Sequence, residues 1–138
     1  MSLHALLGTD MPDNRPLALI DLIKAGLPVE SLAAFKRASG LSDEEVARLL
    51  NIGGRTLSRV RSAAQERLPS DLSDRLFAVA SIYRLAEGTF GDSKTAIDWL
   101  NAPQFGLGQR VPRDLLSSEL GRQQVRALLQ RIEFGQLA

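Results

Sequence analysis

The chain has 138 residues, 44% of them hydrophobic, and a formal net charge of +1. This length allows one compact domain or two small ones sharing a core, and the low charge means that any basic surface must be local. There is no cysteine, which excludes disulfides and thiolate nucleophiles, and His4 is the only histidine, which excludes multi-histidine zinc sites. We therefore predict that the protein is not an enzyme and has no catalytic residue, metal or cofactor.

The first 15 residues contain Gly8, Asp10 and Pro12, which predict a flexible arm. They lack the basic and apolar regions of a secretory signal. Elsewhere no apolar run approaches the roughly 20 residues needed to cross a bilayer. We therefore expect a cytoplasmic protein with no membrane contact.

The rest of the chain shows apolar residues at helical spacing and no strand pattern, which predicts an all-α fold. Ser42 followed by Glu45 is a capping box that marks the start of one helix. A long helix from Pro69 is apolar on two sides, which indicates burial between two subdomains or in a dimer interface, and Gly88 and Gly91 are expected to end it. The predicted helices span about residues 16–25, 29–39, 42–50, 55–65, 69–87, 92–101 and 118–134, with a helical turn at 113–116.

The segment after the capping box meets the positional demands of a helix-turn-helix. Ala47 provides the small residue where two helices cross, and Asn51 stands where the chain must turn left-handed. Ile52 fills the corner, and Leu57 and Val60 on the second helix point back toward it. The front half of the chain is therefore predicted to bind DNA.

The second helix of this motif normally lies in the major groove with its first residues against base edges. Residues 55–67 hold four arginines and one glutamate, a local charge of +3. Arg55 and Arg59 are candidates for guanine contacts. Phosphate contacts are assigned to the hydroxyl groups and the other arginines of the segment, namely Thr56, Ser58, Arg61 and Arg67.

The same pattern also fits a helical corner with a solvated basic face. Gly53 and Gly54 favour this alternative, because they stand where many repressors place base-reading side chains. A motif with glycines there is expected to read sequence only modestly.

The back half carries an ordered set of motifs: Ala96-Ile-Asp-Trp-Leu100, Pro103, Leu107-Gly108, Pro112-Arg-Asp-Leu-Leu116, Gly121, Val125, Leu128 and Arg131-Ile-Glu-Phe-Gly135. These residues resemble the toxin-binding domain of Xre/MbcA/ParS-type antitoxins, and more narrowly the antitoxins paired with RES-domain toxins. With the helix-turn-helix, the resemblance extends from near residue 30 to residue 138. The chain departs from the family pattern at Gln109, where a second loop glycine is common, and at Phe134, where a polar residue or histidine is common.

The resemblance implies an antitoxin whose partner is a RES-domain toxin that attacks NAD, or uses it to modify a target, with an ADP-ribosyltransferase-like fold. It also implies a homodimer that blocks the toxin's active-site cleft with its C-terminal segment and forms a larger hetero-oligomer with it. Binding to operator DNA is then expected to repress the protein's own promoter. A stand-alone helix-turn-helix repressor is the alternative function.

The last helix has a core stripe of Val125, Leu128, Leu129 and Ile132. Its outward face is expected to carry Arg122, Arg126 and Arg131. Phe134 and Leu137 beyond it have no further element to bury them, which is typical of a surface that fits a partner's groove, although a tail folded on its own domain is the alternative. The predicted toxin-binding residues are Arg126, Arg131, Glu133, Phe134, Gly135, Gln136, Leu137 and Ala138.

Three regions are predicted: a flexible arm over residues 1–15, an Xre-like helix-turn-helix region over 16–68, and a dimerising and toxin-binding helical domain over 69–138. Trp99 and Leu100 are expected in the core of the last region. If the partner binds NAD, Glu133 and the terminal carboxylate of Ala138 are hypothesised to occupy its phosphate-binding groups.

Overall fold

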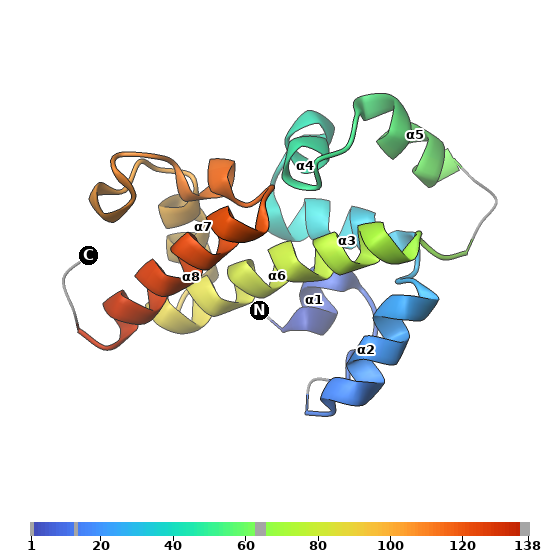
Figure 1. Ribbon diagram of the computed structural model, residues 1–138, viewed down its shortest axis with the longest axis horizontal. Coiled ribbons are helices and arrows are strands. Elements are labelled where there is room, and N and C mark those ends of the chain that lie inside the picture. The colour runs from blue at the N-terminus through green and yellow to red at the C-terminus, as the bar shows by residue number, and fades with distance from the viewer. Residues whose placement is uncertain (1, 13, 63–65, 136–138) are drawn as a thin grey trace. The chain divides into compact units, whose positions relative to one another are not determined.

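The computed structural model describes residues 2–12, 14–62 and 66–135. Over these residues the chain is helical and has no strand, as predicted (Figure 1). The elements are α1 (Leu3–Leu7), α2 (Pro16–Ala25), α3 (Glu30–Ser39), α4 (Asp43–Leu49), α5 (Gly54–Ser62), α6 (Ser70–Phe90), α7 (Ser93–Leu100), the 3-10 helices η1 (Phe105–Leu107) and η2 (Pro112–Leu115), and α8 (Glu119–Glu133). No helix in the described part of the chain has the length and apolarity required to span a membrane.

The chain divides into two compact units, Ser2–Ala80 and Ser81–Ala138, and the division falls within α6. Each unit has apolar side chains that are fully buried, such as Phe35 and Leu50 in the first and Leu100 in the second. The functional border predicted after residue 68 stays a prediction.

The start of the chain differs from the flexible arm expected over residues 1–15. Residues Leu3–Leu7 form α1, which packs on α3 and buries all three of its leucines. Ser2 caps this helix, and the Ser31 hydroxyl donates a 2.6 Å hydrogen bond to the Leu7 carbonyl. The prediction was wrong here because Leu3, Leu6 and Leu7 form a short helical stripe, and the turn-forming residues that follow it masked that pattern.

The long helix α6 also extends further than expected. Gly88 lies inside it, although a glycine in a helix costs about 1 kcal/mol relative to alanine. The helix ends instead at Gly91, whose φ of 76° is left-handed, and Asp92 immediately caps α7. Of the two glycines proposed as stops, only the second acts as one.

In the second unit, η1 and η2 pack against α8, and α7 packs against η2. Leu100 is fully buried as expected, whereas Trp99 is half-buried and its ring lies 5.5 Å from that of Phe90. The side-chain amide of Gln104 donates a 2.9 Å hydrogen bond to the Trp99 carbonyl and ties the following loop to α7. At the start of α8, a side chain on Gly121 would collide with a backbone carbonyl of η2, so glycine permits this close packing.

Candidate functional site

The corner between α4 and α5 has the geometry that the sequence predicts for a helix-turn-helix (Figure 1). Ser42 accepts a 3.2 Å hydrogen bond from the Glu45 amide, and the Glu45 carboxylate accepts one of 2.9 Å from the Ser42 amide. Asn51 has a φ of 55°, the left-handed conformation that the turn requires. Ala47 and Leu57 are buried where the two helices pack.

The outer surface of α5 presents two of the predicted DNA-binding arginines to solvent. Arg55, Ser58 and Arg59 are exposed at positions i, i+3 and i+4, so they share one side of the helix. Thr56 is half-buried beside them. Neither arginine forms an ion pair with another residue in the described ranges, so both guanidinium groups are available to a ligand.

Arg61 is engaged with the neighbouring helix. Its guanidinium donates a 2.8 Å hydrogen bond to the Asp43 carboxylate in the first turn of α4, and Lys36 lies 3.0 Å from the same oxygen. The Lys36 ammonium, followed by the Arg61 guanidinium, lowers the pKa of Asp43. Arg61 therefore links α5 to α4, and its charge is partly neutralised within the protein.

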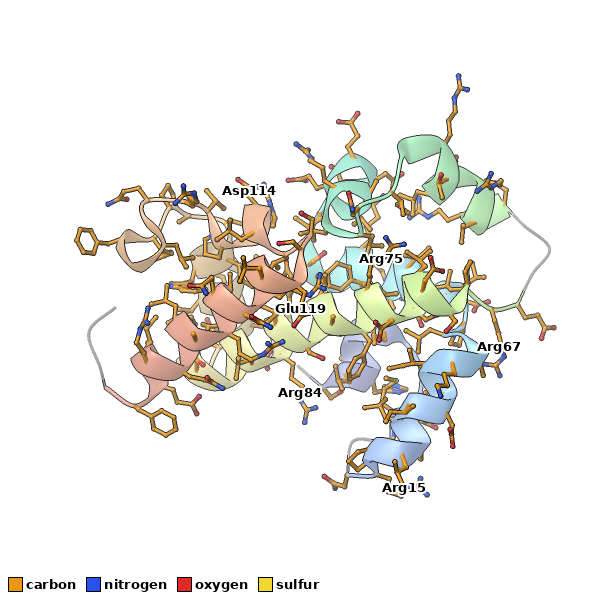
Figure 2. The ribbon with its side chains drawn as sticks, in the orientation of Figure 1. Arg15, Arg67, Arg75, Arg84, Asp114 and Glu119 are labelled. Carbon is orange, nitrogen blue, oxygen red and sulfur yellow. The ribbon has the colours of Figure 1, made fainter. Side chains whose placement is uncertain are left out.

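Arg67 is held by the backbone of the first unit (Figure 2). Its guanidinium donates a 2.8 Å hydrogen bond to the Gly26 carbonyl, and the Leu68 amide donates one of 2.7 Å to the Leu27 carbonyl. The four arginines that the sequence grouped into one basic patch consequently have two roles. Arg55 and Arg59 are free at the surface, whereas Arg61 and Arg67 hold parts of the fold together.

The first turn of α4 adds a feature that sequence reasoning did not use. Asp43, Glu44 and Glu45 place three carboxylates at a helix N-terminus, where they offset the positive end of the helix dipole. The acidic run is visible in the sequence, but the pairing of Asp43 with Arg61, 18 residues away, is set by tertiary packing. These carboxylates limit the positive potential near α5.

On α8, Arg122 is not on the outward face where it was predicted. Its side chain is 8% exposed, and one guanidinium nitrogen donates a 2.9 Å hydrogen bond to the Leu116 carbonyl. A second nitrogen lies 3.1 Å from the carboxylate of Glu119, which is labelled in Figure 2. The Arg122 guanidinium is the main cause of the lowered pKa of Glu119. Arg122 therefore holds the start of α8 to the preceding 3-10 helix.

The core stripe of α8 is buried at Val125, Leu128 and Leu129 as expected, and Ile132 is half-buried. The predicted toxin-binding residues that are described lie at the surface toward the end of this helix. Phe134 is the most prominent, because 77% of it is exposed. Arg126 is half-buried, whereas Arg131, Glu133 and Gly135 are exposed. Gln136, Leu137 and Ala138 lie outside the described residues.

The end of α8 brings a large apolar ring and groups of both charges together. Arg131 is one turn before Phe134, and Glu133 is its direct neighbour. A protruding aromatic ring with charged neighbours fits a recess on another protein better than it fits a nucleic acid backbone. Within the described residues, no group of three or more histidine, aspartate or glutamate side chains is placed to hold a metal ion.

Comparison with known proteins matches both halves of the chain. The antitoxin Xre-like helix-turn-helix domain matches residues 18–81, and the antitoxin Xre/MbcA/ParS C-terminal toxin-binding domain matches residues 85–135. The chain is 32% identical over 126 residues to the antitoxin Xre of Yersinia enterocolitica, covering 91% of this chain and 84% of that protein. It is 30% identical over 115 residues to the antitoxin Xre of Photorhabdus laumondii, covering 83% of this chain and 77% of that one.

The fold is also found in a solved structure. A chain in the crystal structure of the M. tuberculosis MbcT–MbcA toxin–antitoxin complex superposes with a TM-score of 0.57 at 21% sequence identity. The match covers 80% of this chain and 96% of that chain. The two proteins therefore share a helical arrangement.

Proposed function

Because this chain belongs to the Xre family of antitoxins and carries the toxin-binding domain of that family, we propose that it neutralises a RES-domain toxin by placing the end of α8 in the toxin's active-site cleft. The observation that carries the proposal is Phe134, which is 77% exposed at the end of a helix whose core residues Val125, Leu128 and Leu129 are already buried. An exposed aromatic residue next to a completed core is the kind of side chain that anchors a protein interface.

The proposed toxin consumes NAD, so its cleft must hold two phosphate groups. The segment from Glu133 at the end of α8 to Ala138 is proposed to meet the cationic or polar groups that bind those phosphates, with the carboxylate of Glu133 as one acceptor. A carboxylate forms charge-assisted hydrogen bonds with the same donors that recognise phosphate. Arg126 and Arg131 would then contact acidic groups at the rim, and Gly135, Gln136 and Leu137 would line the entry.

The proposal includes repression of the protein's own operon through α5. Arg55 and Arg59 are assigned to guanine edges, because an arginine fork pairs with the O6 and N7 atoms of that base. Thr56 and Ser58 are assigned to phosphates, and Arg61 is assigned to a phosphate that it reaches by exchanging its pairing with Asp43. A two-fold homodimer presents two α5 helices to half-sites roughly one helical turn, about 34 Å, apart. Binding to operator DNA and to toxin would place the protein in the cytoplasm, in a larger hetero-oligomer with toxin.

The test is co-expression with the product of the adjacent gene, with an affinity tag on that product. The full-length antitoxin should co-purify with the tagged protein and protect the host cell from it. Deletion of residues 133–138 should abolish protection, while the truncated chain remains a dimer by analytical ultracentrifugation. Protection that survives the deletion rejects the end of α8 as the inhibitory element. If full-length protein captures no adjacent product yet represses a promoter, it is a stand-alone repressor.

A further inference from the structure

The helix α2 has an apolar surface that its own unit leaves largely uncovered. All of its residues except Asp21 and Lys24 are apolar, yet it contributes only Ile23 to the core. Leu17 is 77% exposed and Ile20 is 46% exposed. A helix that is apolar almost all round is normally buried, and a contiguous exposed apolar patch indicates a contact surface.

The exposed face of α2 continues into a recess beside the first turn of α6. Ile20, Ile23 and Lys24 form one wall of this recess, and Ser70, Asp71 and Asp74 form the other. Leu17, Ile20 and Ile23 recur every three residues, so they follow one another along the same side of α2. The result is an apolar strip that ends, at the C-terminal end of α2, against two carboxylates.

The two ends of this strip carry different charged groups. Arg15 precedes α2 and is exposed at the end of the helix that lies away from the first turn of α6 (Figure 2). At the other end, Asp71 lies 3.6 Å from Arg75, and Lys24 lines the same recess. Asp74 is exposed there and forms no ion pair with another described residue, so a partner that matches this surface presents a carboxylate to Arg15 and a cation to Asp74.

We propose that a second copy of this chain covers the strip, with the two α2 helices antiparallel about a two-fold axis near Ile20. In that arrangement Leu17 packs at the mouth of the partner subunit's recess, which Ile23 lines, since both residues lie three residues, about 4.5 Å along the axis, from the centre. Arg15 then reaches the partner subunit's Asp74. A two-fold contact makes each pairing twice, so Arg15 at one end and Asp74 at the other make the surface complementary to itself.

This inference rests on the proposed function in one respect, the homodimer. What it adds is the surface through which the two copies contact each other. The contact uses α2 and the first turn of α6. It therefore lies on both sides of the predicted border after residue 68, whereas the sequence placed dimerisation in residues 69–138 alone.

The experiment is sedimentation velocity of the full chain without toxin, over a micromolar concentration series. The wild type is expected to sediment as a dimer. The double variant Leu17→Asp/Ile20→Asp should be a monomer at the same concentration, with an unchanged helical circular dichroism spectrum, because both side chains are exposed in the single chain. The matched control is Leu120→Asp, which changes a leucine that is 67% exposed on α8 and should leave the dimer intact.

A charge exchange tests the proposed register. Arg15→Glu and Asp74→Arg should each weaken the dimer on the order of tenfold, since each places two like-charged pairs in the contact. The two substitutions together should restore dissociation to within a few-fold of the wild type. The proposal is overturned by a monomeric wild type, by an α2 variant that stays dimeric, by a control that dissociates, or by a charge exchange that restores nothing.

Toxin capture separates this inference from the proposed function. The monomeric α2 variant is expected to bind toxin as the wild type does, because the end of α8 is unchanged. If α2 variants lose toxin capture while their oligomeric state does not change, the strip belongs to the toxin and the inference is overturned. If changes at Phe134 leave toxin capture intact, the proposed function fails, whereas the dimer contact stands.

Discussion

The outer face of α5 and the end of α8 are alike in their buried apolar residues but differ in the groups that they expose to solvent. Each helix turns apolar residues inward, with Leu57 buried under α5 and Leu128 buried under α8. On α5 the exposed side chains are those of two arginines, which form no ion pair with a described residue, and two serines. At the end of α8 the outermost group is the ring of Phe134. The first surface suits a phosphate backbone, and the second suits a recess on a protein.

Arginine content alone does not identify a binding face. Arg55 and Arg59 are free, whereas Arg61 pairs with Asp43 and Arg122 is buried against the Leu116 carbonyl. In the sequence these four residues look alike, because each lies on a predicted helix beside a core position. Only the packing around them separates residues that meet a partner from residues that hold the fold.

Among the substitutions that we propose, Phe134→Asp should have the greatest effect, which is the loss of toxin binding. Truncating an aromatic anchor at the centre of an interface costs about 2–4 kcal/mol, and a carboxylate there adds a desolvation cost. Toxin affinity, measured by calorimetry, should fall by at least about a hundredfold. Operator affinity should not change.

The matched control for this variant is Phe105→Asp, since that ring is 81% exposed in the same unit. It should retain toxin binding. Equal losses in both variants would show that the toxin contacts a broad apolar surface instead of the end of α8.

The double variant Arg55→Ala/Arg59→Ala should have the next greatest effect, which is a loss of operator affinity. Each specific guanine contact is worth about 1–3 kcal/mol, so affinity should fall by at least tenfold. The dependence of binding on salt should also become less steep, because fewer counterions are released. Arg131→Ala removes an exposed arginine from α8 and serves as the control in fluorescence anisotropy titrations. Full operator affinity in the double variant would count against α5 as the reading helix.

Arg122→Met should lower the stability of the fold without changing the binding of toxin or operator DNA. The buried Leu116 carbonyl loses its donor, which is expected to cost about 1–3 kcal/mol in the free energy of unfolding. Arg131→Met, at an exposed position of the same helix, should be nearly neutral in the same denaturant titration. Equal stability of the two variants would place Arg122 among the surface arginines, as the sequence suggested.

The smallest expected effect is a gain in operator binding in Asp43→Asn. The substitution releases Arg61 and Lys36 from their shared carboxylate, so affinity at moderate salt should rise by a few-fold and its salt dependence should steepen by about one counterion. An unchanged salt dependence would mean that Arg61 does not reach a phosphate.

The same variant carries a prediction about acid stability. The pKa of Asp43 is lower in the folded chain than in the unfolded chain, so its ion pairs stabilise the protein above the ordinary carboxyl pKa. That stabilisation is lost as the pH falls through the lowered pKa. The free energy of unfolding of Asp43→Asn should therefore fall less than that of the wild type in acid, which thermal melts across that range measure.

The sequence predicts the helices and the corner well, because both depend on local signals. The Ser42–Glu45 capping box and the left-handed Asn51 are each determined by a few neighbouring residues and are confirmed. Gln109 shows the limit of such signals. It keeps a left-handed φ of 66° where the family commonly has glycine, so the loop retains its turn without the expected residue.

The partners of charged side chains could not be predicted, because distant parts of the chain provide them. Arg61 finds Asp43 across a corner, and Arg122 finds a carbonyl in another element. The burial of α1 likewise depends on its contact with α3. The residues at the two candidate sites were named from the sequence, but which of the arginines are free required the structure.

The most direct test measures toxin affinity and operator affinity on the same preparations of two variants, Phe134→Asp and Arg55→Ala/Arg59→Ala. Because the two ligands are assigned to different residues, we predict that the first variant loses only toxin and the second loses only operator DNA. A single variant that loses both ligands while remaining folded and dimeric, or a reversal of the two losses, would contradict it.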